Sequence, residues 1–538
     1  MLNVRPYTPA LQKLAAKFDC GNSYLNQFLR SPDALDAGVG KTFVFLTENA
    51  ESIVGYYNLS CGSLDEIEGD VRYKIGGTIH IGYFAIDEKF QHQLQATTPN
   101  GIHLYWGDVL LEECLSRIEA IRSQQVGVSF VSIANARENL EAEQPVCNFN
   151  AVAREARADW ARTLDRVTVE GGTEEQRRVF YTALYHTQIH PTVLQDVNGE
   201  YPKMESNENG KTAGNRYTVY SLWDTYRNLS QLETLLYPDR QVDMINSMID
   251  MYREWGWMPK WELFSRETWT MEGDPAIPYI ADAYMRGLRG FDIKTAYKAF
   301  RTSATLPGKE NRMRPDIDDY IAKGYVPLGA FAQDNSGDNS VSHALEYYIA
   351  DYALSNLATA LGKKDDAALF YKRSLGYKHY YDKEFGTLRP RHADGSWLTP
   401  FDPKDGADFS NAPGFHEGSA WNYTFYVPHD VKGLARLMGG EKAFVNKLQR
   451  VFDENLYDPA NEPDIAYPYL FSYFKGQEWR TQKEVARLLD KYYKDTPDGI
   501  PGNEDCGTMS SWAIFSMIGL YPDCPGQPYY TLTTPVFD

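Results

Sequence analysis

The hydrophobic pattern of the chain changes character near residue 150. Before that point, β-branched and aromatic residues form short runs, the second of them punctuated by glycine, which is a pattern typical of strands. These runs are 41–48, 52–64 and 80–90. A helical spacing of apolar residues follows at 106–123, and the apolar run 126–133 predicts one more strand. Residues 1–125 are therefore predicted to form an α+β domain.

After residue 150 the apolar positions recur at helical spacing in one segment after another. The predicted helices are 149–167, 173–189, 221–236, 240–256, 340–362 and 364–382. Long loops rich in Gly, Pro, Asp and Trp separate them, and no strict sequence period relates them. Successive helix pairs with such loops predict a toroid of helical hairpins.

Composition narrows the class of function without naming one. The 538 residues are enough for two or more domains, and a net charge of −19 argues against binding nucleic acid or an anionic membrane surface. Aromatic residues make up 14%, which suits either sugar binding or large cores. The six cysteines show no zinc-ligand spacing, and neither a signal peptide nor an 18-residue apolar stretch is present, so we expect a cytoplasmic chain outside the membrane.

Adjacent carboxylates stand on a glycine turn near the end of the chain. In "GIPGNEDCGTMSSW", residues 499–512, Glu504 and Asp505 lie between Gly502 and Gly507 and precede an apolar helical run. One interpretation is a capping turn, because acids favour the start of a helix. The other is a general base held on a rigid turn at a pocket, which in a glycosidase requires a second carboxyl group as acid.

Other inter-helix loops also place acids among Trp, Tyr and Gly. The candidates are Glu417 in "FHEGSAWNYTFYVPHDV", Glu462 and Asp464 in "NEPDIAYPYLF", Lys260, Glu262 and Glu267 in "WMPKWELFSRETW", and Asp224 beside Trp223 in "SLWDTYR". Each has a structural alternative: Asp224 as a helix cap, for example, or Lys260 and Glu262 as a surface ion pair. The repetition of one theme favours a carbohydrate hydrolase with an acidic, aromatic cavity.

These motifs carry a family resemblance. From about residue 126 the chain resembles glycoside hydrolase family 92, the calcium-dependent inverting exo-α-mannosidases, through "VEGGTEEQRRVFYTALYHT", "YSLWDTYRNL", "WMPKWEL", "HEGSAWNYTFYVPHDV", "NEPDIAYPYLF" and "PGNEDCGTMSSWAIFSMIGLYP" in family order. The resemblance implies an α/α six-hairpin barrel as the catalytic domain, over residues 151–538. Residues 126–150 are then expected to be a linker, a remnant of the family's N-terminal β-sandwich.

The resemblance also implies roles for residues. Glu417 matches the general acid and Asp505 the general base, with Asn503 assisting, while Glu504 is expected to be structural. Trp223, Asp224, Lys260 and Glu262 are expected to hold the terminal mannose. Asn461, Glu462 and Asp464 are expected to bind Ca²⁺, since all three offer oxygen ligands. The expected partners are α-mannoside glycans of the N-glycan or yeast-mannan type.

The chain departs from the family at its front. Residues 1–133 resemble part of a GCN5-related N-acetyltransferase, through "FDCGNSYLNQFL", "IVGYYNLSCGSL" and "HIGYFAIDEKFQ", but "HQLQATTPNGIHLYWGDVL" replaces the expected pyrophosphate loop. Two alternatives to a mannosidase therefore stay open: an acyl-CoA-dependent transferase or CoA-binding module, and a catalytically dead sugar-binding remnant. Without the sandwich we expect a mannosidase that is weak or inactive.

Overall fold

The computed structural model divides the chain into two compact units, which we describe separately. The N-terminal unit contains Met1–Val128 and Ala136–Arg157, and the helical unit contains Ser129–Asn135 and Ala158–Asp538. The structure describes residues 3–36, 39–68, 71–97, 103–120, 126–145, 148–330, 339–407 and 412–538. Between residues 129 and 157 the chain therefore alternates between the two units: 129–135 belong to the helical unit and 136–157 to the N-terminal unit. The sequence analysis expected a linker over 126–150.

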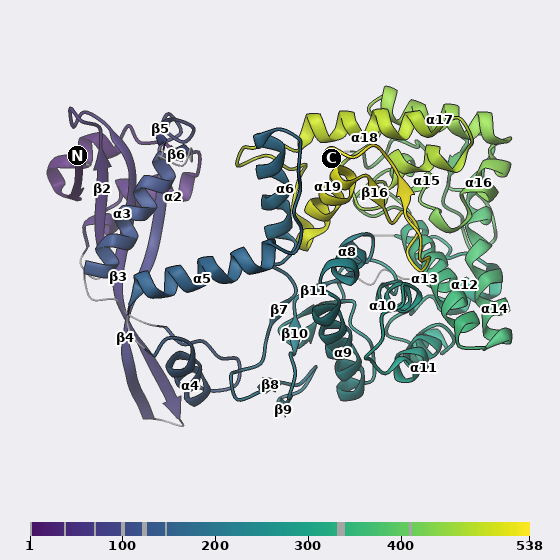
Figure 1. Cartoon of the computed structure of the whole chain (residues 1–538), viewed down its shortest axis with the longest axis horizontal. Helices are drawn as coiled ribbons and strands as arrows, with labels where there is room; N and C mark the ends of the chain where they lie inside the picture. Colours follow the sequence, from purple (N-terminus) through teal and green to yellow (C-terminus); the bar gives the residue numbers. More distant parts are fainter. Residues whose placement is uncertain are drawn as a thin grey trace. The chain divides into compact units, whose positions relative to one another are not determined.

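An antiparallel sheet forms the centre of the N-terminal unit (Figure 1). Its strands lie in the order β1 (Asn3–Pro6), β2 (Lys41–Leu46), β3 (Ile53–Glu68) and β4 (Val71–Ile86), so each strand pairs with the next in sequence. The three predicted strands correspond to β2, β3 and β4 and are confirmed. A separate hairpin joins β5 (Leu94–Thr97) to β6 (His103–Tyr105).

Side-chain alternation along β2 gives this sheet two apolar faces. Val44 and Leu46 belong to one buried cluster, with Phe28 and Leu29 of helix α2 (Ser23–Arg30), while Phe43 and Phe45 belong to another. The second cluster includes residues of helix α3 (Trp106–Ala120), predicted as 106–123. The helices of this part of the chain are α1 (Gln12–Ala15), α2 (Ser23–Arg30), α3 (Trp106–Ala120), α4 (Ile133–Glu143) and α5 (Phe149–Leu164). Residues 121–125, which hold the end of the predicted helix and the predicted domain boundary, lie outside the described residues.

The strand predicted over 126–133 is wrong. Residues 126–132 are irregular, and Ile133 begins α4. Side chains take the backbone bonds that a strand would use: Asn139 donates to the Val128 carbonyl at 2.8 Å, and the Ser129 hydroxyl accepts from the Val131 amide at 2.9 Å. The Ser132 hydroxyl accepts from the Asn135 amide of α4 at 3.1 Å. Ser132 therefore acts as a local helix start, which the apolar run around it conceals.

The helical unit is mainly α, as predicted, with short two- and three-residue strands between its helices (Figure 1). Its helices are α6 (Glu174–His186), α7 (Leu222–Thr225), α8 (Leu229–Leu236), α9 (Pro238–Trp255), α10 (Ala276–Met285), α11 (Ile293–Ser303), α12 (Ile317–Lys323), α13 (Ser340–Ala360), α14 (Lys364–Ser374), α15 (Ala420–Thr424), α16 (Val431–Leu437), α17 (Glu441–Asp453), α18 (Glu478–Tyr492) and α19 (Thr508–Ile518). Its strands are β7 (Thr192–Val193), β8 (Glu200–Pro202), β9 (Asn209–Lys211), β10 (Tyr217–Thr218), β11 (Tyr220–Ser221), β12 (Trp261–Leu263), β13 (Arg266–Glu267), β14 (Tyr381–Asp382), β15 (Thr387–Leu388), β16 (Leu520–Tyr521) and β17 (Thr531–Leu532).

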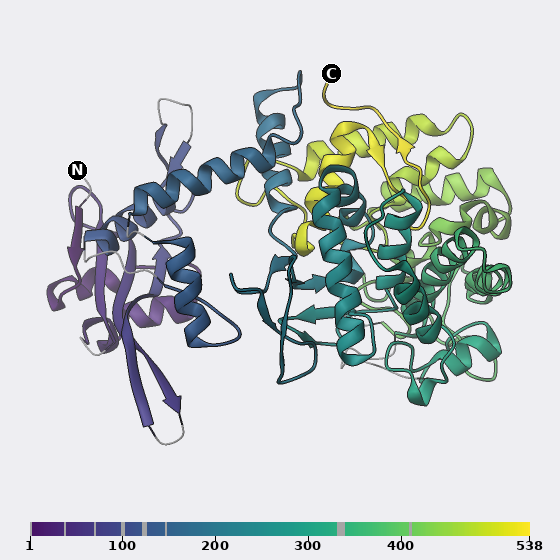
Figure 2. The ribbon, with the colours of Figure 1, turned by 60° about the horizontal axis from the view of Figure 1, so that its bottom comes forward.

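Burial separates inner helices from outer ones. Nearly all of α10, α13 and α19 is buried, whereas α9, α17 and α18 bury one face and expose the other. The partners α8 with α9, α13 with α14 and α16 with α17 are in contact, and the last helix, α19, packs against the first, α6. The helices therefore close into a ring, whose members run from blue (α6) through teal and green to yellow (α19) in Figure 2.

Two predicted helices of this unit differ from the structure. The segment 221–236 is broken into α7 and α8, with Asn228 between them at φ −154°. The segment 364–382 ends its α-helix at Ser374 and continues as a 3₁₀ turn, Leu375–His379. The predicted helices 149–167, 173–189, 240–256 and 340–362 are confirmed as α5, α6, α9 and α13. Within the part of the chain that the structure describes, no helix is long and apolar enough to cross a membrane.

Candidate active site

An open cavity of about 520 Å³ lies in the helical unit, between loops that join helices of the ring. Its walls come from α7, from the β12–β13 hairpin and the loop after it, from the loop before α15, from the loop after α17 and from the turn before α19. The lining residues are Ser221, Trp223, Asp224, Trp261, Thr268, Thr270, Met271, Glu417, Ala460, Glu462, Gly502, Asn503, Asp505 and Cys506. The cavity thus brings together acids that lie almost 300 residues apart in sequence.

Asp505 enters the cavity from a strained turn. It begins the 3₁₀ turn Asp505–Gly507 with φ +50°, in the left-handed region. Gly507 has φ +100°, and a side chain there would meet Cα of Thr187 at 3.1 Å. Close backbone packing and left-handed geometry therefore explain why the carboxylates need a glycine beside them.

Glu504 points to a different task. Its carboxylate accepts from the Ser510 amide at 3.0 Å and from the Ser510 hydroxyl at 2.8 Å, at the start of α19. Nδ1 of His186 lies 2.9 Å from the same carboxylate. Of the two adjacent acids, Glu504 stabilises the start of α19, as the capping interpretation expects, and Asp505 lines the cavity, where the other interpretation places a general base.

Glu417 stands on a second left-handed position, with φ +47°. The side-chain amide of Asn461 donates to the Glu417 carbonyl at 2.6 Å, and a side chain on Gly418 would meet that amide at 2.9 Å. Directly after it, Ser419 and Asn422 form a capping box that starts α15. The Glu417 side chain is 38% exposed and lines the cavity.

Three carboxylates of the cavity form a compact cluster. Oxygens of Asp224, Glu462 and Asp505 all lie within 4.8 Å of one another. Burial raises the pKa of all three carboxyls, and their mutual repulsion raises those of Asp224 and Glu462 further. A set of hard oxygen donors with excess negative charge fits a divalent cation such as Ca²⁺, which would favour the ionised forms.

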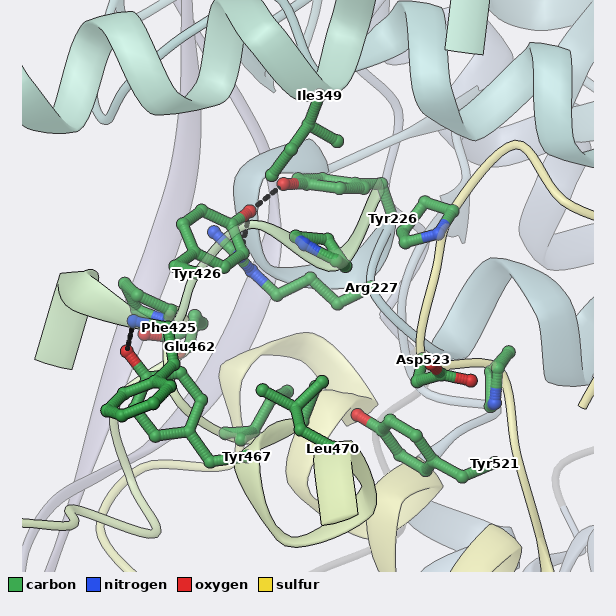
Figure 3. A pocket seen from close by; sticks show the side chains of 16 residues that line it. Tyr226, Arg227, Ile349, Phe425, Tyr426, Glu462, Tyr467, Leu470, Tyr521 and Asp523 are labelled. Atoms are coloured by element: carbon green, nitrogen blue, oxygen red, sulfur yellow. Dashed lines mark hydrogen bonds between the residues drawn. The ribbon is translucent and has the colours of Figure 1, made fainter. Parts of the chain in front are cut away.

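Buried side chains around the Arg227–Glu346 ion pair pack beside this cluster. Arg227 pairs with Glu346 at 2.8 Å, and its guanidinium lies 4.7 Å from the centre of the Trp223 ring. Tyr226 donates to Glu346 at 2.6 Å and is hydrogen-bonded to Tyr426 (Figure 3). Tyr226, Arg227 and Tyr426 border a cavity of about 20 Å³, enough for one water molecule, which Glu462 also lines. These contacts fix α7, which carries Trp223 and Asp224.

The structure brings six of the residues expected from sequence to this cavity. They are Glu417, Asp505, Asn503, Trp223, Asp224 and Glu462. Glu262, expected to hold mannose, lies elsewhere: its buried carboxylate accepts from the Thr218 hydroxyl at 2.8 Å and from the Val219 amide at 3.0 Å. These bonds tie the β12 strand to the segment before β11, which is a structural task.

Lys260, Asn461 and Asp464 also lie outside the lining set. Lys260 is completely buried, and desolvation lowers its pKa against the opposing effect of nearby acids, of which Glu272 is the strongest. Asp464 accepts from the Asn422 side chain at 2.9 Å and from the Asp458 amide at 3.1 Å. Oδ1 of Asn461 is buried without a hydrogen-bond partner among the described residues, which leaves it free to act as a ligand.

Several residues of the site were not found from the sequence. Trp261 lines the cavity from β12, and Thr268, Thr270 and Met271 line it from the loop after β13, in which Trp269 and Met271 have positive φ. Arg227 is part of the quoted "SLWDTYR" motif, four residues after Trp223, and this helical spacing was a usable signal. The sequence does not indicate the left-handed backbone of the loop, because Trp269 and Met271 stand where glycine would usually mark such a conformation.

Comparison with known proteins identifies the class of enzyme. The glycosyl hydrolase family 92 catalytic domain matches residues 135–538, and the chain belongs to this family. It is therefore a glycoside hydrolase by descent. A curated relative, an uncharacterized secreted glycosidase of Arthroderma benhamiae, is 27% identical over 443 residues, which is 77% of this chain and 53% of the relative.

Solved structures of the family are similar over most of the chain. One is a family GH92 α-mannosidase from Bacteroides thetaiotaomicron, also solved in complex with mannoimidazole, at 28% identity and a TM-score of 0.70, covering 92% of this chain and 64% of that one. Another is a GH92 inverting mannosidase from the same organism, at 26% identity and a TM-score of 0.70, covering 92% and 67%. The chain spans between half and two thirds of the length of these relatives.

The similarity to the α-mannosidases reaches beyond the helical unit. A 92% share of the chain is more than residues 126–538 alone supply, so part of the strand-rich N-terminal unit also aligns with these structures. The comparisons give the acetyltransferase likeness of residues 1–133 no support. The strand-rich fold of that region fits a separate domain, as the sequence predicted.

Proposed function

We propose that this chain removes terminal α-linked mannose from glycans by a single displacement with inversion at the anomeric carbon. The observation that carries the proposal is that Glu417 and Asp505 line one cavity in a member of family 92. Inverting glycosidases need two carboxyl groups about 6.5–9.5 Å apart, one to protonate the leaving oxygen and one to activate water. Similarity to a solved inverting mannosidase supports the same chemistry.

The two acids take different roles in this proposal. Glu417 donates its proton to the glycosidic oxygen, which departs with the electron pair of the C1–O bond. Asp505 takes a proton from the water whose oxygen forms the new bond to C1. Asn503 lines the cavity two residues before Asp505, and we assign to it the orientation of that water.

The carboxylate cluster supplies a place for Ca²⁺. Asp224, Glu462 and Asp505 offer three oxygen ligands within 4.8 Å of one another, and Asn461 and Asp464 remain further candidates on the same loop as Glu462. These carboxylates would hold the cation, which would neutralise their charge and would supply an electrophilic contact for sugar hydroxyls. The pKa of Asp505 is raised by burial, so such neutralisation favours the ionised form that a general base requires.

The substrate assignment rests on the relatives. A similar family GH92 α-mannosidase was solved in complex with mannoimidazole, and the cavity described above has room for a sugar ring beside Trp223 and Trp261. We propose that the non-reducing mannose of N-glycan or mannan chains binds there. Asp224 is available to accept hydrogen bonds from its hydroxyls.

An assay of the purified chain tests the proposal. Wild type, Glu417→Gln and Asp505→Asn are compared on α-mannobiose with added Ca²⁺, and each variant is expected to lose about 10²–10⁴-fold in kcat. Glu504→Gln is the matched control, because this neighbouring acid stabilises α19 and does not line the cavity. Turnover that survives Glu417→Gln refutes the assignment of the acid. A longer family member run alongside measures whether the chain is weak, as the sequence analysis expects.

A further inference from the structure

A buried histidine–glutamate pair lies behind Glu417, outside the cavity lining. Nε2 of His416 is 3.6 Å from Oε1 of Glu417, and Nδ1 of the same ring is 2.5 Å from Oε1 of Glu272. The His416 side chain is 5% exposed and that of Glu272 is completely buried. Glu417 therefore has the cavity on one side and a buried charged pair on the other.

The pair is anchored by a second histidine and by the backbone. The other carboxylate oxygen of Glu272 is paired with Nε2 of His343 on α13. Directly after Glu272, Gly273 has φ +78°, and a side chain there would lie 2.4 Å from Cβ of Glu346. Glu272 is thus held against α13 in two ways. Its carboxylate pairs with His343, and Gly273 next to it lets the backbone approach Glu346 closely. The imidazole of His416 therefore has a fixed partner.

Charge makes the arrangement directional. Burial alone lowers the pKa of His416, but its contacts with Glu272 and Glu417 outweigh burial and raise that pKa to about 10. Glu272 lies between His343 and His416, and His343 also has a raised pKa, through Glu272 and then Asp316. When Glu417 is ionised, as it is once its proton has left, His416 is an imidazolium near neutral pH, and its Nε2–H faces the Glu417 carboxylate.

We propose that Glu272 and His416 are positioning residues for proton donation by Glu417. This inference rests on the proposed function, in which Glu417 gives its proton to the leaving oxygen and becomes a carboxylate. The His416 cation holds that carboxyl group from behind and stabilises the negative charge that develops on it as the proton leaves. Glu272 keeps His416 charged and in place.

A histidine that positions the acid and a merely structural histidine affect the rates for good and poor leaving groups differently. Cleavage of a poor leaving group, such as the mannose of α-mannobiose, depends strongly on the acid. A dinitrophenolate departs without protonation, so cleavage of 2,4-dinitrophenyl α-mannoside depends little on it. Loss of acid positioning therefore lowers the rate for the first substrate only, whereas a damaged fold lowers both rates together.

The experiment compares kcat/KM for the two substrates in wild type, His416→Asn and Glu272→Gln. We expect each variant to lose about 10²-fold on α-mannobiose and less than about 3-fold on the dinitrophenyl substrate. His429→Asn is the matched control. His429 belongs to the same helical unit, but its Nε2 is bonded to the Ser374 carbonyl at 2.8 Å, away from Glu417. Equal losses on both substrates, or no loss on either, overturn the proposal.

Glu417→Gln separates this inference from the proposed function. If Glu417→Gln shows the leaving-group split and the His416 and Glu272 variants do not, the inference is wrong while Glu417 remains the acid. If Glu417→Gln shows no split, the proposed function itself fails. Nitrogen NMR of histidine-labelled wild type gives a readout without turnover: an imidazolium signal for His416 at pH 7.5 that is lost in Glu272→Gln supports the inference, and a neutral ring in wild type overturns it.

Discussion

Asn461 donates its side-chain amide to the backbone carbonyl of Glu417 at 2.6 Å, across 44 residues of sequence. The bond holds Glu417 at φ +47°, a conformation that costs free energy in a non-glycine residue. The backbone of the proposed acid is therefore fixed by a residue that the sequence suggested as a calcium ligand.

The first prediction separates these two roles of Asn461. Asn461→Asp replaces the N–H donor with an oxygen that faces the Glu417 carbonyl, while it keeps an oxygen for a cation. We expect kcat on α-mannobiose to fall about 10–10²-fold, because a small displacement of the catalytic acid lowers the rate strongly. The Ca²⁺ concentration for half-maximal activity is not expected to increase. A normal kcat would show that the bond does not position Glu417.

Calcium dependence is the second prediction. Removal of divalent ions with a chelator is expected to abolish hydrolysis, and Ca²⁺ is expected to restore it. Since Glu462 belongs to the carboxylate cluster, Glu462→Gln is expected to raise the Ca²⁺ requirement by at least ~10-fold. Melting of the protein with and without Ca²⁺ gives a second readout, because a ligand of the folded state raises the melting temperature. Melting and activity that are both indifferent to Ca²⁺ would refute the assignment.

Removal of the buried guanidinium is expected to destabilise the helical unit. Arg227 and Glu346 are 4% and 2% exposed and form an ion pair, so Arg227→Met leaves a carboxylate buried without its counter-charge. We expect a loss of about 3–5 kcal/mol in the free energy of unfolding, measured by urea titration. Addition of Glu346→Gln is expected to recover part of it, and a loss below about 1 kcal/mol would show that the pair is not a support of α7.

A fourth prediction concerns stability and pH. Burial raises the pKa of Glu233 on α8 from 4.5 to about 8. The folded state therefore keeps a proton that the unfolded chain releases, so this contribution to stability is complete below pH 4.5 and is lost as the pH rises toward about 8. In Glu233→Gln, whose side chain still accepts from Gln188, the decline in urea midpoint between pH 5.5 and 8 is expected to be smaller than in wild type. An unchanged slope would contradict the prediction.

The sequence predicted what depends on local pattern. The β-branched and aromatic run 41–48 and the helical spacing over 240–256 are properties of the chain itself, and both elements formed as predicted. The break between α7 and α8 was not predictable, because it accompanies the burial of Arg227 against Glu346, which lies 119 residues away. The irregular backbone at 126–132 depends likewise on side-chain bonds from Asn139 and to Ser129, which the apolar pattern of this run does not indicate.

The candidate site divides in the same way. Glu417 and Asp505 stand in motifs that can be quoted, and both line the cavity. Glu272 supports His416 from 144 residues away, and nothing in the local sequence of either residue indicates the contact. Glu262, which the resemblance assigned to the mannose, is buried outside the lining residues, and its hydrogen bonds tie β12 to the segment before β11.

Proton NMR during the first minutes of hydrolysis gives the stereochemistry of the reaction. The purified chain is mixed with an α-linked mannoside and Ca²⁺, and the anomeric signals of free mannose are followed before mutarotation mixes them. If Asp505 activates water while Glu417 protonates the leaving oxygen, β-mannose appears first and α-mannose only later. Initial release of α-mannose would mean a covalent intermediate and would contradict the roles assigned to both carboxylates.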